Sequence, residues 1–253
     1  MKLHASLSED LAAWAQRQPV FFTASAATHG RHINVSPKGM TDTHFAVLGP
    51  NQCAYIDRTG SGCETISHAY ENGRLCLMFM SFGNTPRILR FFCHARVVEW
   101  DQPAFPDLVR TVAKGKREAF EGARAVILCD IWEVQTSCGY GVPRVKKGHG
   151  GDDKLDELAV FEARPTMDSW AATKAQSNTL HAYQGLNNSK SIDGLPGLRS
   201  ARRDTGQTLW VGDARARVRR ILAAPEAVAT GFALAVGLYL LMAGLKVLLL
   251  SPL

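Results

Sequence analysis

Short runs rich in apolar and β-branched residues recur at close spacing along the first half of the chain and are typical of strands. Turn residues such as Gly, Pro and Asn separate these runs at short intervals. The pattern predicts six or seven strands, taken from Val20–Ala26, His32–Pro37, His44–Leu48, Cys53–Asp57, Leu75–Phe82, Ile88–Trp100 and Ala125–Thr136. Close spacing of this kind favours a small barrel or sandwich over alternating βαβ units.

Helical spacing of apolar residues is found in shorter segments between and after the strands. Ser8–Gln18 has Ser8 as a candidate N-cap, and Pro19 follows it. Glu64–Asn72 is followed by Gly73, a residue typical of helix ends. The same criteria predict helices over Phe105–Lys114 and Ser169–Asn188. The fold class expected from these elements is mainly β with flanking helices.

The last apolar run has no strand or amphipathic pattern. Ala227–Leu245 carries no charge, and Val247–Leu250 extends it past Lys246. As a helix these 24 positions would be about 36 Å long, enough to cross a hydrocarbon core of about 30 Å. A buried core helix is the alternative, but one so apolar on every face is unusual in a soluble domain. We expect a single-pass C-terminal membrane anchor.

Charge is concentrated just before this run. The chain has a formal net charge of +6, and seven arginines between residues 199 and 220 face only Asp204 and Asp213 there. The remainder is nearly neutral, which argues against a nucleic-acid-binding face spread over the fold. Basic flanks stay on the cytoplasmic side of a membrane, so the folded domain is expected to face the cytoplasm. The six cysteines lack metal-binding spacing and indicate a reducing compartment.

A strand-to-helix connection at Arg58-Thr59-Gly60-Ser61-Gly62 is the best candidate for chemistry. Backbone N–H groups of such a turn, together with a helix N-terminus, form an anion site. Lys38, at the end of an earlier strand, is placed to reach the same point. The alternative is an ordinary connection in which Arg58 is solvated.

The order of several short motifs over roughly residues 15–145 resembles the pyridoxamine 5′-phosphate oxidase-related family. The motifs are NVSPKG, FAVLGPNQCAYIDRTGSG, ETISHAYENGRLCLMFMSF, PRILRFFCHARVVE and SCGYGVP. A later segment, SIDGLPGL at residues 191–198, resembles one branch of that family. The resemblance implies an FMN-binding split β-barrel and a homodimer that holds the flavin between its subunits.

The family pattern assigns flavin contacts residue by residue. The resemblance places the strand residues Asn34, Val35, Ser36, Pro37 and Lys38 along the flavin, the turn residues Arg58, Thr59, Gly60, Ser61 and Gly62 at its phosphate, and Arg87 at a further flavin-facing position. Two features depart from the family. Cys63-Glu64 stands where oxidases have a basic residue, and Gly139–Leu198 has no counterpart of their substrate clamp. Pyridoxamine phosphate is therefore not the expected substrate.

The leading hypothesis is an FMN-dependent oxidoreductase tethered to a membrane and acting on a small redox substrate, with FAD or a deazaflavin as alternative cofactors. A non-catalytic split-barrel module for binding or sensing is the second hypothesis, and haem binding is a third. No residue is assigned a catalytic role, since histidines on strands and helices are more often structural. The expected domains are a flavin-binding barrel over residues 1–145, an extension over 146–198, a basic linker over 199–226 and the membrane helix over 227–250.

Overall fold

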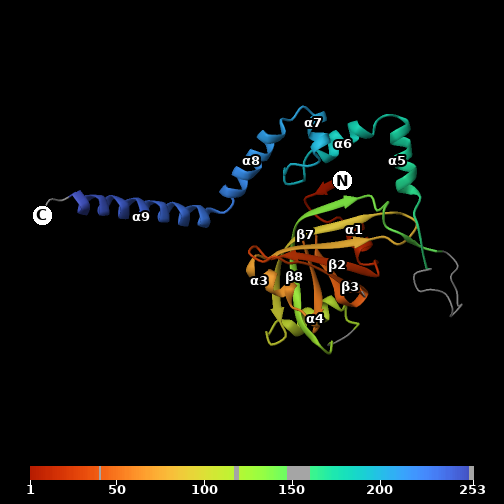
Figure 1. Cartoon of the computed structure of the whole chain (residues 1–253). Helices are drawn as coiled ribbons and strands as arrows, with labels where there is room; N and C mark the ends of the chain where they lie inside the picture. The colour runs from red at the N-terminus through yellow and green to blue at the C-terminus, as the bar shows by residue number, and fades with distance from the viewer. Residues whose placement is uncertain (40, 117–119, 147–159, 251–253) are drawn as a thin grey trace. The chain divides into compact units, whose positions relative to one another are not determined.

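The computed structural model describes residues 1–39, 41–116, 120–146 and 160–250 (Figure 1). The chain divides into two compact units, Met1–Met167 and Asp168–Leu253. The first unit contains the strands and the helices α1 to α4, and the second consists of helices. The sequence from Gly139 to Gly151 is rich in Gly and Lys and is expected to form a loop, and its part after residue 146 lies outside the described residues.

One antiparallel sheet organises the first unit. Its hydrogen-bonded order is β3-β2-β6-β7-β8-β5-β4, and β1 pairs with β8 as well. The strands are β1 (Lys2–His4), β2 (Val20–Ala26), β3 (Ile33–Gly39), β4 (Phe45–Gly49), β5 (Gln52–Arg58), β6 (Arg74–Met80), β7 (Ile88–Glu99) and β8 (Ala123–Ser137). The predicted mainly-β class with flanking helices is confirmed. Within this sheet, the strand that the sequence pattern missed is β1, whose three residues are too few to show a pattern.

The sheet curls on itself instead of remaining open. Lys38 lies on β3 at one edge of the sheet, whereas Asp57 lies on β5 near the other edge. Their side chains nevertheless form an ion pair, with Nζ 3.0 Å from Oδ1. This contact joins the two ends of the strand order across the interior, as a barrel requires.

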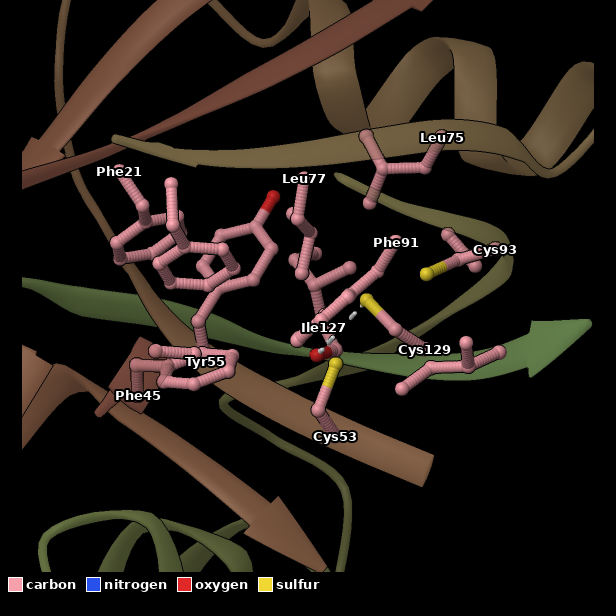
Figure 2. Packing of buried hydrophobic residues seen from close by; sticks show 14 of the residues in the cluster. Phe21, Phe45, Cys53, Tyr55, Leu75, Leu77, Phe91, Cys93, Ile127 and Cys129 are labelled. Carbon is pink, nitrogen blue, oxygen red and sulfur yellow. Dashed lines mark hydrogen bonds between the residues drawn. The ribbon is translucent and has the colours of Figure 1, made fainter. Parts of the chain in front are cut away.

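The interior of the curled sheet is filled by side chains from alternate strand positions (Figure 2). Phe21 of β2 stacks on Phe79 of β6 with ring centroids 5.4 Å apart, and Phe45 and Tyr55 also contact the Phe21 ring. All four are fully buried. Each such side chain stabilises the fold by about 1.5–3 kcal/mol through burial of its apolar surface. These four side chains come from β2, β4, β5 and β6, each of which corresponds to a predicted strand.

A second apolar cluster covers the opposite face of β4, β5 and β8. Helix α4 (Phe105–Val112) contributes Val109 and Val112 to this cluster. They pack with Ala54 and Ile56 of β5 and Val126 of β8. Strand β5 is consequently buried on both faces, which explains its nearly continuous apolar sequence.

Three further helices belong to this unit. Helix α1 (Glu9–Ala15) begins at Ser8, whose hydroxyl accepts a hydrogen bond from the Leu11 amide as predicted. Helix α3 (Glu64–Glu71) is followed by Gly73 with φ +69°. Helix α2 (Thr41–His44) was not expected, and the strand predicted to begin at His44 begins at Phe45 instead. The buried Thr41 hydroxyl donates to the Gln18 carbonyl and fixes this helix.

The first unit extends beyond residue 145. Strand β9 (Arg144–Val145) pairs with β10 (Phe161–Glu162). Arg164 is 8% exposed and donates to the carbonyls of Gly83, Asn84 and Val142. This guanidinium ties the segment after β10 to the loop between β6 and β7.

The second unit differs from two sequence expectations. Ser169–Asn188 forms two helices, α5 (Thr166–Gln176) and α6 (Leu180–Asn188), because Asn178 between them has φ +52°. Arg199–Arg220, expected to be a linker, is largely helical as α7 (Arg199–Asp204) and α8 (Leu209–Leu222). Helix α9 (Pro225–Leu250) spans the apolar run, and its residues Pro225–Ala243 are long and apolar enough to cross a membrane.

Candidate functional site

Strand β3 presents polar side chains on one face and apolar side chains on the other. Asn34, Ser36 and Lys38 are half-buried, while Ile33 and Val35 on the opposite face are 77% and 61% exposed. Since successive strand residues point to opposite faces, the three polar side chains line up toward the interior. The structure thus aligns three of the predicted flavin contacts in one row.

The Asn34 end of this row joins a hydrogen-bonded network with helix α3. The Asn34 amide donates to the hydroxyls of Thr65 and Ser25, at 2.9 and 3.3 Å. Ser36 donates to Asn34 Oδ1 at 2.9 Å, and Ser25 is 2.9 Å from Nδ1 of His68. This network fixes the side-chain orientation of Asn34 and Ser36 and holds α3 against β2 and β3.

The Lys38 end joins a buried ionic cluster. Asp57 is 2% exposed, and its two oxygens accept from Lys38 at 3.0 Å and from Arg124 at 2.7 Å. Arg124 also donates to the Gly62 carbonyl at 2.6 Å. The cluster therefore connects the predicted phosphate turn to the C-terminal end of β3.

A β-bulge places Arg124 in this cluster. Asp57 pairs with Ala125 across the β5–β8 ladder, but the next residue, Arg58, pairs with Ala123. Arg124 is the additional residue of β8 at this point, and a bulge of this kind redirects the side chain it carries. Sequence reasoning missed both Arg124 and Asp57, because strand register is not visible in one sequence.

The turn itself is anchored at its start and open in its middle. The Thr59 amide donates to the Gly122 carbonyl at 2.6 Å, and Arg58 Nη2 donates to the Glu121 carbonyl at 3.1 Å. A Cβ on Gly60 would meet nothing within 4 Å, whereas one on Gly62 would collide with the Glu64 carboxylate. Glu64 therefore covers the Gly62 side of the turn.

Arg87 lies in other surroundings. Its guanidinium is 5.5 Å from the ring centroid of Trp14 in α1. It lines a cavity of about 630 Å³ together with residues of β1, α1 and the end of β8. The contact between Arg87 and a flavin stays a prediction.

The donor set of the turn fits a phosphate group. Three cations (Lys38, Arg58 and Arg124) stand against two carboxylates (Asp57 and Glu64), and Ser61 is an exposed hydroxyl at the open part of the turn. Arginine and lysine bind phosphate through charge-assisted hydrogen bonds. Of the two acids, Asp57 is held by Lys38 and Arg124, so Glu64 is the one that a phosphate would have to displace.

Three buried thiols come together in the barrel interior although they are far apart in the sequence (Figure 2). The Sγ atoms of Cys53, Cys93 and Cys129 lie within 4.8 Å of one another. Burial raises the pKa of the Cys53 thiol, and the neighbouring thiols together with burial raise the pKa of Cys93 and Cys129. Protonated thiols pack as small apolar groups.

Comparison with known proteins agrees with the sequence motifs. The chain is 49% identical over 208 residues to the pyridoxamine 5′-phosphate oxidase family protein ustO of Aspergillus flavus, covering 82% of each chain. This chain belongs to the pyridoxamine 5′-phosphate oxidase family. Family membership confirms the resemblance on which the flavin contacts were predicted. No protein-family model matches the chain.

Solved structures give weaker similarity. HupZ of Group A Streptococcus has a TM-score of 0.42 and 16% identity, covering 52% of this chain and 99% of its own. An FMN-binding protein of Syntrophomonas wolfei has a TM-score of 0.38 and 8% identity, covering 49% of this chain and 80% of its own. At this level of similarity they carry no argument about the site of this family member.

Proposed function

We propose that this protein binds FMN and acts as an FMN-dependent oxidoreductase on a small-molecule substrate. The observation that supports the proposal is the row Asn34, Ser36 and Lys38, which runs from the α3 network to the ionic cluster at the turn. It lies in a chain whose family is named for an oxidase. A bound flavin would supply the electron chemistry, and the protein would orient it.

The residues of the site have separate tasks in this proposal. Arg58, Lys38 and Arg124 neutralise the phosphate charge, and Ser61 donates to a phosphate oxygen. Asn34 and Ser36 are already oriented by Thr65 and by each other, so they offer polar contacts to the flavin without further ordering. The substrate is a compound other than pyridoxamine phosphate, because Gly139–Leu198 carries no counterpart of the family's basic substrate clamp.

Flavin occupancy of purified variants tests the proposal. Charge-assisted contacts of about 1.5–3 kcal/mol imply that Arg58→Ala or Lys38→Met weakens FMN binding about ten- to a hundredfold. Arg17→Ala removes an exposed arginine after α1, outside the polar row and the turn, and serves as the control. The full-length protein and each variant are purified in detergent, and the released cofactor is identified and quantified by chromatography.

The expected result is flavin in the wild type and in Arg17→Ala, with strong loss in the other two variants. Chromatography also identifies the cofactor as FMN, FAD or a deazaflavin. Equal flavin content in all four proteins would show that Lys38 and Arg58 do not hold the flavin.

A cofactor-free binding or sensing module is the second candidate. The observation that favours it is the neutralisation of the site by the protein's own acids, since Asp57 pairs with both inner cations and Glu64 covers Gly62. Glu64→Gln distinguishes the two. If the protein is a flavoprotein, FMN should bind more tightly after loss of the carboxylate. If it is a cofactor-free module, the variant should retain no FMN once the excess has been removed.

The proposal also places the protein in a membrane through α9 and pairs it as a homodimer around the flavin. The membrane placement of α9 is supported by the length and composition of its segment Pro225–Ala243, which is 0% buried. The dimer is supported by the exposed apolar residues on the outer face of β3.

A further inference from the structure

The segment SIDGLPGL, residues 191–198, forms a tight loop that the flavin proposal does not use. The Ser191 amide donates to the Leu195 carbonyl at 2.9 Å, and the Ser191 hydroxyl accepts from the Leu195 amide at 3.1 Å. Gly194 has φ +74°, and a Cβ on Gly197 would collide with the Asn188 carbonyl. Both glycines are therefore required for the loop to lie this close to the end of α6.

Arg202 of α7 is an unusually buried arginine behind this loop. Only 2% of it is exposed, yet its Nη1 reaches Asp213 at 2.8 Å and its Nη2 donates to the Leu209 carbonyl at 3.0 Å. Its Nε is buried and has no hydrogen-bond partner among the described residues. A guanidinium with an unused buried donor leaves free energy to be gained from a further acceptor.

The loop and the helices α7 and α8 line an open cavity of about 710 Å³ within the second unit. Its lining contains five basic residues and one acid, namely Lys190, Arg202, Arg215, Arg219, Arg220 and Asp193. Arg215 and Arg219 are four residues apart on α8, so they lie on one face of the helix and repel each other. Arg219 reaches the loop, since its Nη1 lies 3.5 Å from the position a Cβ on Gly194 would take.

We propose that this cavity binds an anion that carries a phosphate group. Clustered guanidinium groups around a concave surface are the arrangement that recognises phosphate through paired, charge-assisted hydrogen bonds. A phosphate near Arg202 offers an acceptor to Nε and relieves the repulsion between Arg215 and Arg219. The ligand is either a phospholipid headgroup, as the chain position of α8 just before α9 suggests, or a soluble phosphate compound.

The test compares two charge-matched double variants of the full-length protein in detergent. Arg215→Gln with Arg219→Gln removes two lining cations, whereas Arg203→Gln with Arg217→Gln removes two exposed arginines that do not line the cavity. Binding of inorganic phosphate is measured by calorimetry at constant ionic strength. Retention of phosphatidylglycerol, against phosphatidylcholine, is measured by native mass spectrometry. Circular dichroism checks that both variants keep the helical content of the wild type.

The expected result is that at least one of these two probes binds, that the cavity variant loses at least tenfold in affinity, and that the control retains wild-type binding. Selective retention of phosphatidylglycerol identifies a lipid headgroup, and binding of inorganic phosphate without lipid retention identifies a soluble ligand. Equal loss in the two double variants would reduce the effect to diffuse surface charge and overturn the proposal, as would the failure of both probes to bind. The flavin content does not enter the test, so its outcome is independent of the oxidoreductase proposal.

Discussion

Asp57 illustrates how one buried residue determines the arrangement of several others. A carboxylate that is 2% exposed is costly unless it is paired, and here both of its oxygens are paired with cations. Lys38 and Arg124 come from β3 and β8, so the carboxylate draws both strands toward the turn. Lys38→Met leaves Arg124 in place, which is why that variant is expected to fold and to report on flavin binding.

The three clustered thiols permit a prediction at the same scale. Cys53, Cys93 and Cys129 are shielded in the barrel interior, whereas Cys63 and Cys138 are exposed. Burial also raises the pKa of the half-buried Cys76 to about 11. Because the thiolate is the reactive form, we expect iodoacetamide at pH 8 to modify Cys63 and Cys138 first and the interior thiols only after unfolding.

Peptide mass mapping of the folded protein, with and without guanidinium chloride, measures this order. Rapid modification of Cys129 in the folded protein would mean that the barrel interior opens on the time scale of the reaction.

At the scale of elements, sequence reasoning succeeded where a local signal sufficed. The strand Val20–Ala26 and the helix starting after Ser8 follow from residue period and capping chemistry alone. Helix α2 depends on the contact of Thr41 with Gln18, more than twenty residues away, and no local pattern contains it. The candidate site divides in the same way, since Lys38 and Arg58 are recognisable from motifs while Arg124 enters only through the register of β8.

Gly73, at the end of α3, provides a prediction on element stability. Its φ is +69°, and an added Cβ would collide with the imidazole of His94 on β7. A left-handed conformation costs a non-glycine residue about 1–2 kcal/mol. We therefore expect Gly73→Ala to lower the free energy of unfolding by at least that amount, measured by urea denaturation.

Gly141→Ala is the matched control, because its Cβ would meet nothing within 4 Å and its φ is not in the left-handed region. His94→Ala combined with Gly73→Ala should remove the collision, so that only the conformational cost of the left-handed backbone remains. An unchanged midpoint for Gly73→Ala would mean that α3 ends differently in solution.

At the scale of the whole molecule, the arginines of α8 predict the orientation of the protein in a membrane. Arg215, Arg217, Arg219 and Arg220 stand before α9, and positive flanks remain on the cytoplasmic side. Protease added to sealed vesicles of known orientation should digest the barrel only from the cytoplasmic face. Complete protection from that face would show the opposite orientation. Release of the intact protein by alkaline carbonate would refute anchoring by α9.

The last prediction concerns pairing of the protein with a second copy. Ile33 and Val35 lie on the outer face of β3 and are 77% and 61% exposed, and Trp132 on β8 is 61% exposed. Ile33 and Val35 stand two residues apart on one face of an edge strand, and neighbouring exposed apolar residues of this kind favour an interaction surface. Two-fold pairing of identical subunits is the commonest way to cover such a surface.

Light scattering of the detergent-purified, full-length protein, corrected for bound detergent, should therefore give twice the chain mass. Val35→Glu should shift the protein toward monomers, because it introduces a charge into the apolar face without touching the core. Trp100→Glu changes an exposed apolar residue in the turn after β7, not on β3, and should leave the mass unchanged. If the flavin lies between subunits, Val35→Glu loses cofactor together with the dimer. A wild-type monomer with full flavin occupancy would show that one chain completes the site alone.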